Sequence, residues 1–159
     1  MPKKLRLGVL GGGGDSLIGV LHRVAAHMYD SYEIVGAVFN PNMEQNVGFA
    51  EQIGIRTDRI YPDFDTLIEK EMQLPESERM QVVSIQTPNF LHFPMAQKLL
   101  ENGFHVICEK PMTTTYEEAK TLRDTHQKAG TVFAVTHTYT GYPMVRQMRG
   151  MIKARALGK

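Results

Sequence analysis

The chain has 159 residues, of which 42% are hydrophobic and 22% are charged, and its formal net charge is +1. These values are ordinary for one globular domain, and they exclude a strongly basic nucleic-acid surface and a membrane span. The single cysteine, Cys108, excludes an internal disulfide framework, and no signal-peptide core follows Met1, so we expect a cytoplasmic protein.

Strand-like and helix-like segments alternate along the chain. Short apolar runs predict strands at residues 5–10, 33–39, 81–86, 104–108 and 131–136, with a brief strand at 60–61. Apolar periodicity and capping residues predict helices at residues 17–28, 42–53, 65–72, 91–100, 115–129 and 144–152. This alternation with short loops is typical of α/β proteins, and it predicts a doubly wound, mostly parallel sheet with helices on both faces.

Two of the predicted helices have a marked apolar face. The residues are Leu17, Leu21, Val24 and Met28 in the first helix and Met144, Met148 and Met151 in the last. Their spacing is that of one side of an α-helix. We expect the methionine face to dock on the sheet or on a further domain rather than to bind a ligand.

Four consecutive glycines follow the first strand. Gly11 and Gly13 occupy the first two glycine positions of a G-x-G-x-x-G pattern, whereas Ser16 stands at the third. If residues 14–16 are an insertion, Gly19 becomes the third glycine, which lets helix and strand pack closely. Bare N–H groups at a helix N-terminus favour a pyrophosphate, although an ordinary flexible turn is the alternative. The predicted dinucleotide contacts are Gly11, Gly12, Gly13, Asp15, Ser16, Leu17 and Ile18.

Further candidates follow the other strands, because ligands of doubly wound sheets bind beyond the carboxyl ends of the strands. The candidate cofactor contacts there are Asn40, Thr87, Pro88, Asn89, Glu109, Lys110 and His137. Helix-entry turn chemistry at residues 87–89 and solvated charges at Glu109 and Lys110 are the alternatives. NAD-binding folds usually place an acid after the second strand, and NADP binders place a base nearby. Asn40 is neutral and no base is present, so NAD is weakly favoured over NADP.

The motifs at these strand ends resemble one family. Thr87-Pro88-Asn89-Phe90-Leu91-His92, the segment from Gly103 to Pro111, and the glycine turn have the order and spacing found in the Gfo/Idh/MocA oxidoreductases. That family includes glucose–fructose oxidoreductase and inositol dehydrogenase. Its most specific mark is Glu-Lys-Pro, here residues 109–111, after a G-x-H-V strand. The resemblance extends from Leu5 to Lys159.

The resemblance implies a Rossmann-type NAD(P)-binding domain at residues 1–140 and, at 141–159, the start of a crossover to a second domain. It implies an NAD(P)-dependent dehydrogenase of a sugar, an inositol or a related polyol. Lys110 would be the catalytic residue, hydrogen-bonding a substrate hydroxyl, and His92 would face the nicotinamide ribose, with plain packing as its alternative. Two other functions stay open: an NAD-dependent glycoside hydrolase of the same family and a nucleotide-sensing regulatory protein.

The second domain of such proteins would complete the substrate site and form most of the oligomer contacts. The chain has no D-x-x-x-H pattern of the kind that this domain commonly contributes. We therefore expect the chain by itself to bind cofactor and to catalyse poorly. No His, Cys, Asp or Glu set has metal-ligand spacing, so we predict no metal site. Cys108 reads as a buried hydrophobe, and the remaining histidines, His22 included, as structural or solvated. The bond before Pro111 is compatible with either isomer.

Overall fold

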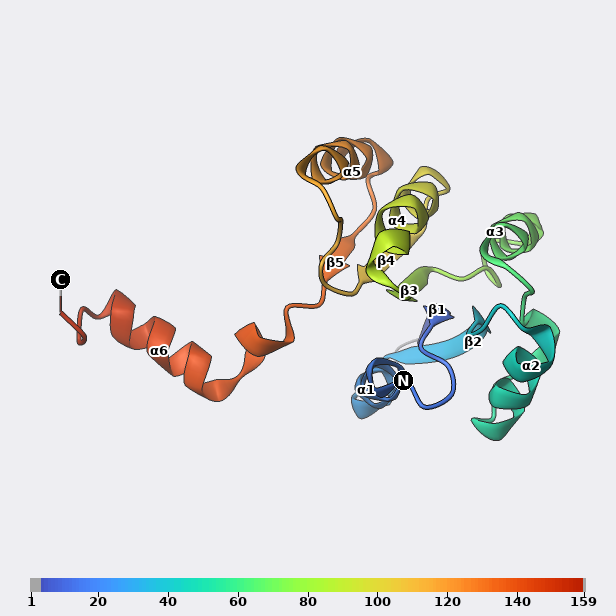
Figure 1. Ribbon diagram of the computed structural model, residues 1–159, viewed down its shortest axis with the longest axis horizontal. Helices are drawn as coiled ribbons and strands as arrows, with labels where there is room; N and C mark the ends of the chain where they lie inside the picture. The colour runs from blue at the N-terminus through green and yellow to red at the C-terminus, as the bar shows by residue number, and fades with distance from the viewer. Residues whose placement is uncertain (1–3, 159) are drawn as a thin grey trace.

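Five parallel strands form one sheet in this computed structural model, which describes residues 4–158 (Figure 1). The strands are β1 (Leu5–Gly11), β2 (Tyr32–Val38), β3 (Val82–Gln86), β4 (His105–Cys108) and β5 (Phe133–Val135). Their order is β2-β1-β3-β4-β5, and each neighbouring pair is parallel. The chain leaves β1 toward β2 on one side and later returns to β3 on the other side. The strand order therefore switches between β1 and β3.

Helices cover both faces of the sheet. They are α1 (Leu17–Met28), α2 (Met43–Gln52), α3 (Phe64–Gln73), α4 (His92–Glu101), α5 (Tyr116–Ala129) and α6 (Pro143–Lys153), with short 3-10 turns η1 (Thr57–Arg59), η2 (Asn89–Leu91) and η3 (Thr138–Gly141). Figure 1 shows α1 and α2 on one face and α3, α4 and α5 on the other. The predicted doubly wound Rossmann-type fold is confirmed.

The apolar core has two layers, one under each set of helices. On the face of α3 to α5, side chains such as Leu67, Leu99 and Leu122 pack against Val83 and Val106 of the sheet. On the face of α1 and α2, a smaller layer is built around Val9, Ala37 and Ala50. Both faces of the central strands are buried, which explains why their sequences are continuous apolar runs rather than alternating ones.

Local signals place most element ends correctly. Thr115 caps α5 through a complete capping box with Glu118, and Gly130 ends that helix at a φ of +66°. Asp63 accepts from the Thr66 amide and begins α3. The brief strand expected at residues 60–61 is one isolated bridge, Ala37 to Ile60. The last strand is shorter than predicted, since it spans only Phe133–Val135.

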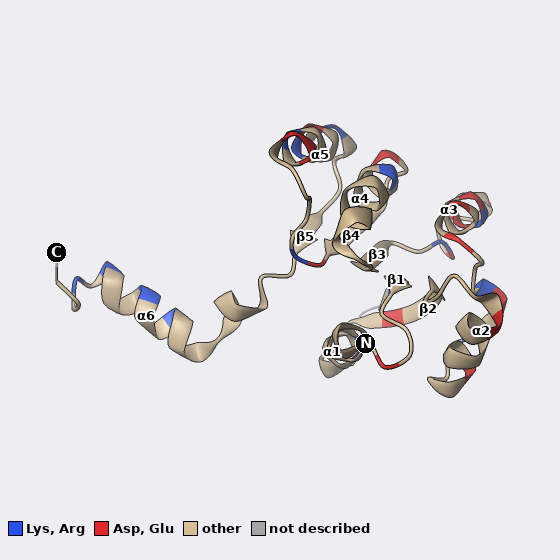
Figure 2. Ribbon diagram, viewed as in Figure 1, with Lys and Arg blue, Asp and Glu red and all other residues tan. Residues whose placement is uncertain are grey.

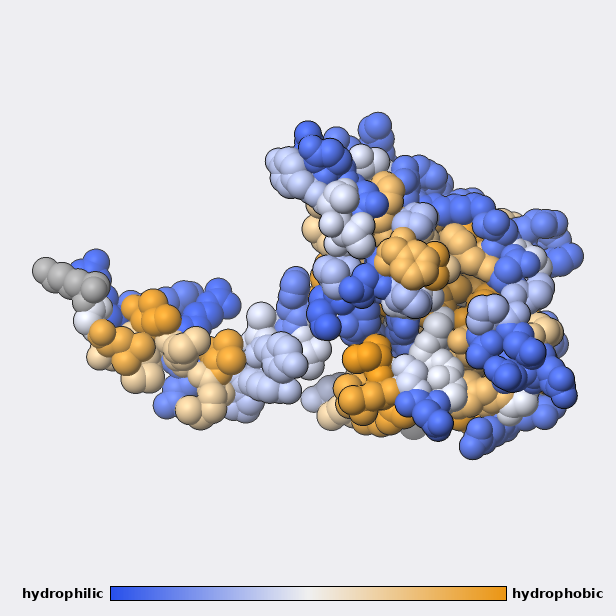
Figure 3. Space-filling view, in the orientation of Figure 1, coloured by the Kyte–Doolittle hydropathy of each residue, from blue (hydrophilic) through white to orange (hydrophobic). Residues whose placement is uncertain are grey.

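The apolar face predicted for α1 does not meet the sheet. Leu17 and Met28 are 70% and 68% exposed, and Leu21 and Val24 are exposed as well. Figure 3 shows this face as an apolar patch over α1. The reason lies at the start of the helix: Gly19 must contact the glycine turn, so the buried face of α1 carries Gly19 and Ala26. Close backbone packing therefore decides the rotation of α1 about its axis, against its apolar pattern.

The last helix projects away from the sheet (Figure 1). Met144, Met148 and Met151 are exposed, so of the two expected partners, the sheet or a further domain, the sheet is not the one that they contact. The charged side chains of α6 are basic only and those of α2 are acidic only, whereas both signs occur on α3, α4 and α5 (Figure 2). Among residues 4–158, no helix combines the length and apolarity needed to cross a membrane.

Candidate functional site

The glycine turn after β1 brings strand and helix into backbone contact. A Cβ on Gly19 would overlap the carbonyl oxygen of Gly12 and would lie 2.6 Å from its carbonyl carbon. Gly12 itself has a φ of +67°, a region that side chains other than glycine rarely adopt. Gly19 thus takes the place of the third glycine, and residues 14–16 are the insertion.

Ser16, at the strict third-glycine position, has a different task. Its hydroxyl accepts a hydrogen bond from the Gly19 amide at 3.1 Å, so it is the N-cap of α1. One turn further, Arg23 donates to the Gly12 carbonyl at 2.7 Å. The turn is therefore held at both ends. Residues 11–14 carry no side chains over their backbone amides, and this arrangement suits a pyrophosphate.

The end of β2 lies against this cradle. A Cβ on Gly13 would lie 2.7 Å from the Cβ of Phe39, which places Asn40 beside the turn. The Asn40 Oδ1 accepts from the Asn42 amide at 2.8 Å. The amide NH2 of Asn40 is thus the group left for a ligand. Buried Asn46 fixes the backbone behind it, because its side chain accepts from Phe39 N and donates to Tyr61 O.

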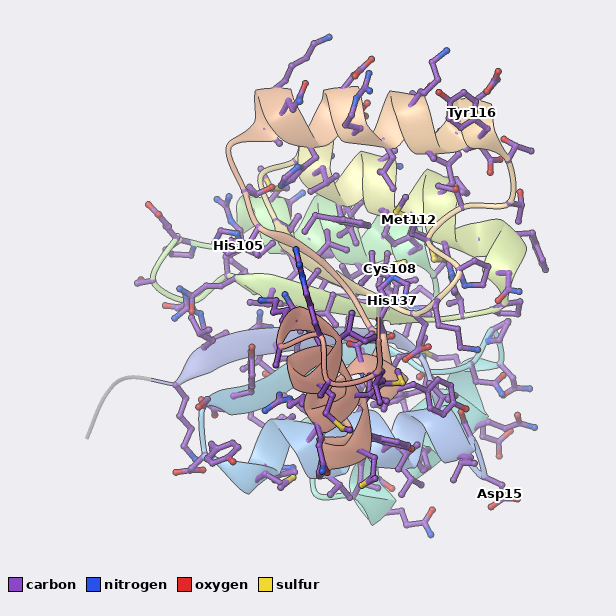
Figure 4. All side chains as sticks on the ribbon, turned by 90° about the vertical axis from the view of Figure 1, so that its left-hand side faces the viewer. Asp15, His105, Cys108, Met112, Tyr116 and His137 are labelled. Carbon is purple, nitrogen blue, oxygen red and sulfur yellow. The ribbon has the colours of Figure 1, made fainter. Side chains whose placement is uncertain are left out.

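The turns after β3, β4 and β5 open on the same edge of the sheet as the glycine turn. Gly11 pairs with Gln86, Ile85 with Cys108, and Cys108 with Val135, so the strand ends are level. In Figure 4, Asp15, Met112 and Tyr116 lie toward one side of the molecule, and His105, which begins β4, lies toward the opposite side. The structure therefore gathers the candidates from four strand ends along one edge.

The individual candidates differ in exposure. Those facing solvent are Asp15, Leu17, Pro88, Asn89, Lys110 and His137; Gly11, Gly13, Ser16, Ile18, Asn40 and Thr87 are half-buried; Gly12, His92 and Glu109 are buried. The Thr87 hydroxyl contacts the sulfur of Met95 at 3.7 Å. An exposed polar group can meet a ligand directly, whereas a buried one acts by holding its neighbours.

His92 connects two of the turns. It is 1% exposed, its Nδ1 lies 2.7 Å from the Pro111 carbonyl, and its Nε2 lies 2.8 Å from the Thr87 carbonyl. Both ring nitrogens are therefore used within the protein, and no nitrogen remains to face a ribose. His92 therefore links the turn after β3 to the turn after β4.

Glu109 is held by three donors. The Thr136 hydroxyl and His22 Nε2 lie 2.6 Å and 2.9 Å from its Oε1, and the Lys110 amide lies 3.2 Å from its Oε2. Burial by itself raises the pKa of the Glu109 carboxyl, but the hydrogen bonds from Thr136, His22 and Lys110 outweigh burial and hold that pKa below its ordinary value. Glu109 is predicted from the sequence to contact the cofactor, but its buried carboxylate is used within the protein, so the geometry favours a task in orienting the loop.

Sequence reasoning missed the part that His22 takes in this arrangement. A histidine in the middle of a helix gives no local signal, and its partners are 62 and 87 residues away along the chain. A second histidine, His105, accepts from the Val132 amide at 2.9 Å and has the structural place expected of it.

Lys110 extends from the same loop toward solvent. It follows β4 at the carboxyl edge, and its peptide bond to Pro111 is cis. Its ammonium makes no hydrogen bond or ion pair with any residue from 4 to 158.

Cys108, the residue before Glu109, is fully buried, and burial raises the pKa of its thiol to about 12. Cys108 is therefore a buried, protonated thiol, as expected of a small buried hydrophobe.

The part of the chain that the structure describes holds no group of three or more His, Cys, Asp or Glu side chains arranged to bind a metal ion. The edge of the sheet offers instead a backbone cradle, amide and hydroxyl side chains and one unpaired ammonium. This set suits a dinucleotide, because backbone amides match a pyrophosphate and amide and hydroxyl side chains match ribose hydroxyls.

The fold and this edge together define a nucleotide-binding domain of the Rossmann class. Residues 5–137 match the family model GFO_IDH_MocA, an oxidoreductase family with an NAD-binding Rossmann fold. The chain belongs to this family, as its motifs predicted.

Relatives support the assignment along the whole chain. The uncharacterized oxidoreductase YfiI of Bacillus subtilis (strain 168) is 33% identical over 157 residues, which are 98% of this chain and 39% of that protein. The crystal structure of an inositol dehydrogenase homolog complexed with NAD+ from Azotobacter vinelandii is 38% identical, with a TM-score of 0.94 over 100% of this chain and 40% of that one. The scyllo-inositol 2-dehydrogenase (NADP(+)) IolW of Bacillus subtilis (strain 168) is 27% identical over 84% of this chain and 33% of its own. The chain thus spans 33% to 40% of the length of these relatives.

Proposed function

We propose that this chain is the cofactor-binding part of a dehydrogenase that acts on a sugar, an inositol or a related polyol. The observation that carries the proposal is the pairing of a pyrophosphate cradle at Gly12 and Gly19 with an unpaired ammonium, Lys110, at the same sheet edge. The similar Azotobacter vinelandii protein is also described in complex with NADH and myo-inositol. Bound NAD(P) would supply the hydride acceptor or donor for the reaction.

The residues of this chain divide the remaining work. The backbone of residues 11–13 would hold the pyrophosphate, and Asn40 would face the adenosine ribose. Thr87, Asn89 and His137 would line the cofactor beyond β3 and β5. Lys110 would hydrogen-bond the reacting substrate hydroxyl, where an ammonium stabilises the negative charge that develops on oxygen as hydride leaves.

A second domain would complete the substrate site. We assign residues 1–140 to the cofactor-binding domain and 141–159 to the beginning of the connection to that second domain. The relatives are more than twice as long as this chain, and the exposed apolar side chains of α6 suit contact with further structure. Oligomer contacts are assigned to the second domain as well. The buried thiol of Cys108 suits a protein of the cytoplasm.

Titration of the chain with NADH and with NADPH tests the proposal. Nicotinamide fluorescence and calorimetry would give the two dissociation constants, and micromolar binding of at least one cofactor is the expected result. Gly13→Val is the informative variant, because its side chain would meet Phe39 and close the cradle. Gly48→Val is the matched control, since no atom lies within 4 Å of a Cβ at that position. A folded chain that binds neither cofactor overturns the proposed function.

A further inference from the structure

We infer that His22 is a positioning residue for the Glu109–Lys110 loop, so that helix α1 serves the pyrophosphate cradle at its start and the catalytic loop one turn later. The inference rests on the proposed function. Its basis is a buried chain of polar side chains that runs from β3 through α1 to the end of β5. The members of the chain are Gln86, Ser84, His22, Glu109 and Thr136.

The position of His22 is fixed by the helix that carries it. Gly19 contacts the backbone of Gly12, and Arg23 donates to the Gly12 carbonyl, so α1 is held against the glycine turn on either side of His22. The His22 side chain is only 16% exposed. Its ring lies between Ser84 of β3 and Glu109, the first residue after β4.

The hydrogen bonds that link these polar side chains are consistent with donation in one direction, from Gln86 toward Glu109. Gln86 Nε2 donates to Ser84 Oγ at 3.0 Å, and the Ser84 hydroxyl is then free to donate to His22 Nδ1 at 3.1 Å. With Nδ1 as the acceptor, the ring carries a hydrogen on Nε2 and donates it to Glu109 Oε1 at 2.9 Å. With this tautomer each donor has an acceptor, and Glu109 receives its bonds as a carboxylate.

The consequence for the site follows from the geometry of Glu109. Its Oε1 accepts from His22 and Thr136, and its Oε2 accepts from the amide of Lys110. The carboxylate thus sets the direction in which the chain leaves β4, and with it the starting point of the Lys110 side chain. Loss of the His22 donor would leave Thr136 to hold Oε1, so the carboxylate would be held less firmly and its hydrogen bond to the Lys110 amide would weaken.

The loss of affinity caused by removal of the His22 donor should be confined to the nicotinamide half of the cofactor. The glycine turn and the end of β2 serve the pyrophosphate and the adenosine, whereas β4 lies on the far side of β3 from both. The loop after β4 therefore belongs to the nicotinamide half. A ligand that lacks nicotinamide should not depend on His22.

The test compares NADH with ADP-ribose, which has no nicotinamide. In His22→Leu we expect NADH binding to weaken about tenfold, the effect of one hydrogen bond to a charged group, while the ADP-ribose affinity stays within about twofold of wild type. His22→Gln keeps an N–H donor for Glu109 and should restore NADH binding to within about threefold. His27→Leu makes the same change at an exposed site of the same helix and should leave both affinities unaltered.

Thr136→Val provides an independent route, because it removes the other donor to Glu109 Oε1 without touching α1. The same division between NADH and ADP-ribose is expected, and this variant carries the test if His22→Leu fails to fold. Equal weakening of both ligands in His22→Leu, failure of His22→Gln to recover NADH binding, or no effect in either variant overturns the inference. A wild-type chain that binds neither ligand would instead overturn the proposed function.

Discussion

Replacing Gly19 by alanine should separate the packing of the cradle from the general preference of helices for alanine. The added Cβ would overlap the Gly12 carbonyl oxygen and would lie 2.8 Å from the Gly12 Cα. Ordinary carbon–carbon contacts are about 3.5–4.0 Å, so helix and strand must separate by roughly 1 Å. The atoms in the way belong to the backbone, which cannot rotate aside as a flexible side chain would.

The expected free energy combines two opposing effects. Alanine in a helix is favoured over glycine by about 1 kcal/mol, and overpacking of a close contact costs about 1–3 kcal/mol or more. Because the clashing atoms are backbone, the overpacking cost lies at the upper end of its range, and we expect Gly19→Ala to lower the free energy of unfolding by roughly 2 kcal/mol. Displacement of the Gly12 and Gly13 amides should also weaken NADH binding more than tenfold, which corresponds to about 1.4 kcal/mol.

Gly48→Ala is the matched control for this variant. Gly48 also lies inside a helix, but no atom is within 4 Å of a Cβ at that position, so alanine there should raise the free energy of unfolding by about 1 kcal/mol. Urea denaturation followed by circular dichroism gives both values, and calorimetry gives the NADH affinities. If Gly19→Ala behaves like Gly48→Ala in stability and binding, the close-packing argument is refuted.

Three further predictions concern cofactor choice, stability and pH. Asn40→Asp should weaken NADPH binding about tenfold or more relative to NADH, because it replaces the amide donor proposed to face the ribose by a carboxylate. Gln52→Glu, an exposed site at the far end of α2, is the charge control, and an unchanged affinity ratio would count against Asn40. Glu71→Ala should lower the free energy of unfolding, measured by urea denaturation, by about 3–5 kcal/mol, because it leaves Arg59 and Tyr61 without their fully buried partner. Glu78→Ala, at an exposed site, should have little effect, and equal effects of the two variants would contradict the reasoning. The pKa of Glu109 is lower in the folded chain than in the unfolded one, so its contribution to stability is complete above the ordinary glutamate pKa and is lost as the pH falls through the lowered value. Stability measured against pH should therefore decline less steeply on acidification in Glu109→Gln, and an identical slope would disprove the linkage.

Much of the fold could be predicted because its signals are local. The apolar runs of the strands, the Thr115 capping box and the stop at Gly130 lie within a few residues of the features that they determine. The strand-end motifs led to the family as well, because they resemble those of its members. The rule that ligands bind beyond the carboxyl ends of parallel strands predicted that the candidates share one edge of the sheet. The apolar face of α1 stays exposed, because its burial depends on how close backbone packing rotates the helix about its axis and not on the apolar period.

The sequence by itself determined the alternation of elements, the family and the candidate residues at each strand end, because these depend on short-range patterns. Only the tertiary structure decided which glycine closes the cradle, since Gly19 is identified by its contact with Gly12 and not by its position in the motif. It also decided the partners of His22 and His92, whose hydrogen bonds join separate turns and elements. The carboxylate of Glu109 is held by groups from α1, from the end of β5 and from its own loop, and that meeting exists only once the sheet has formed.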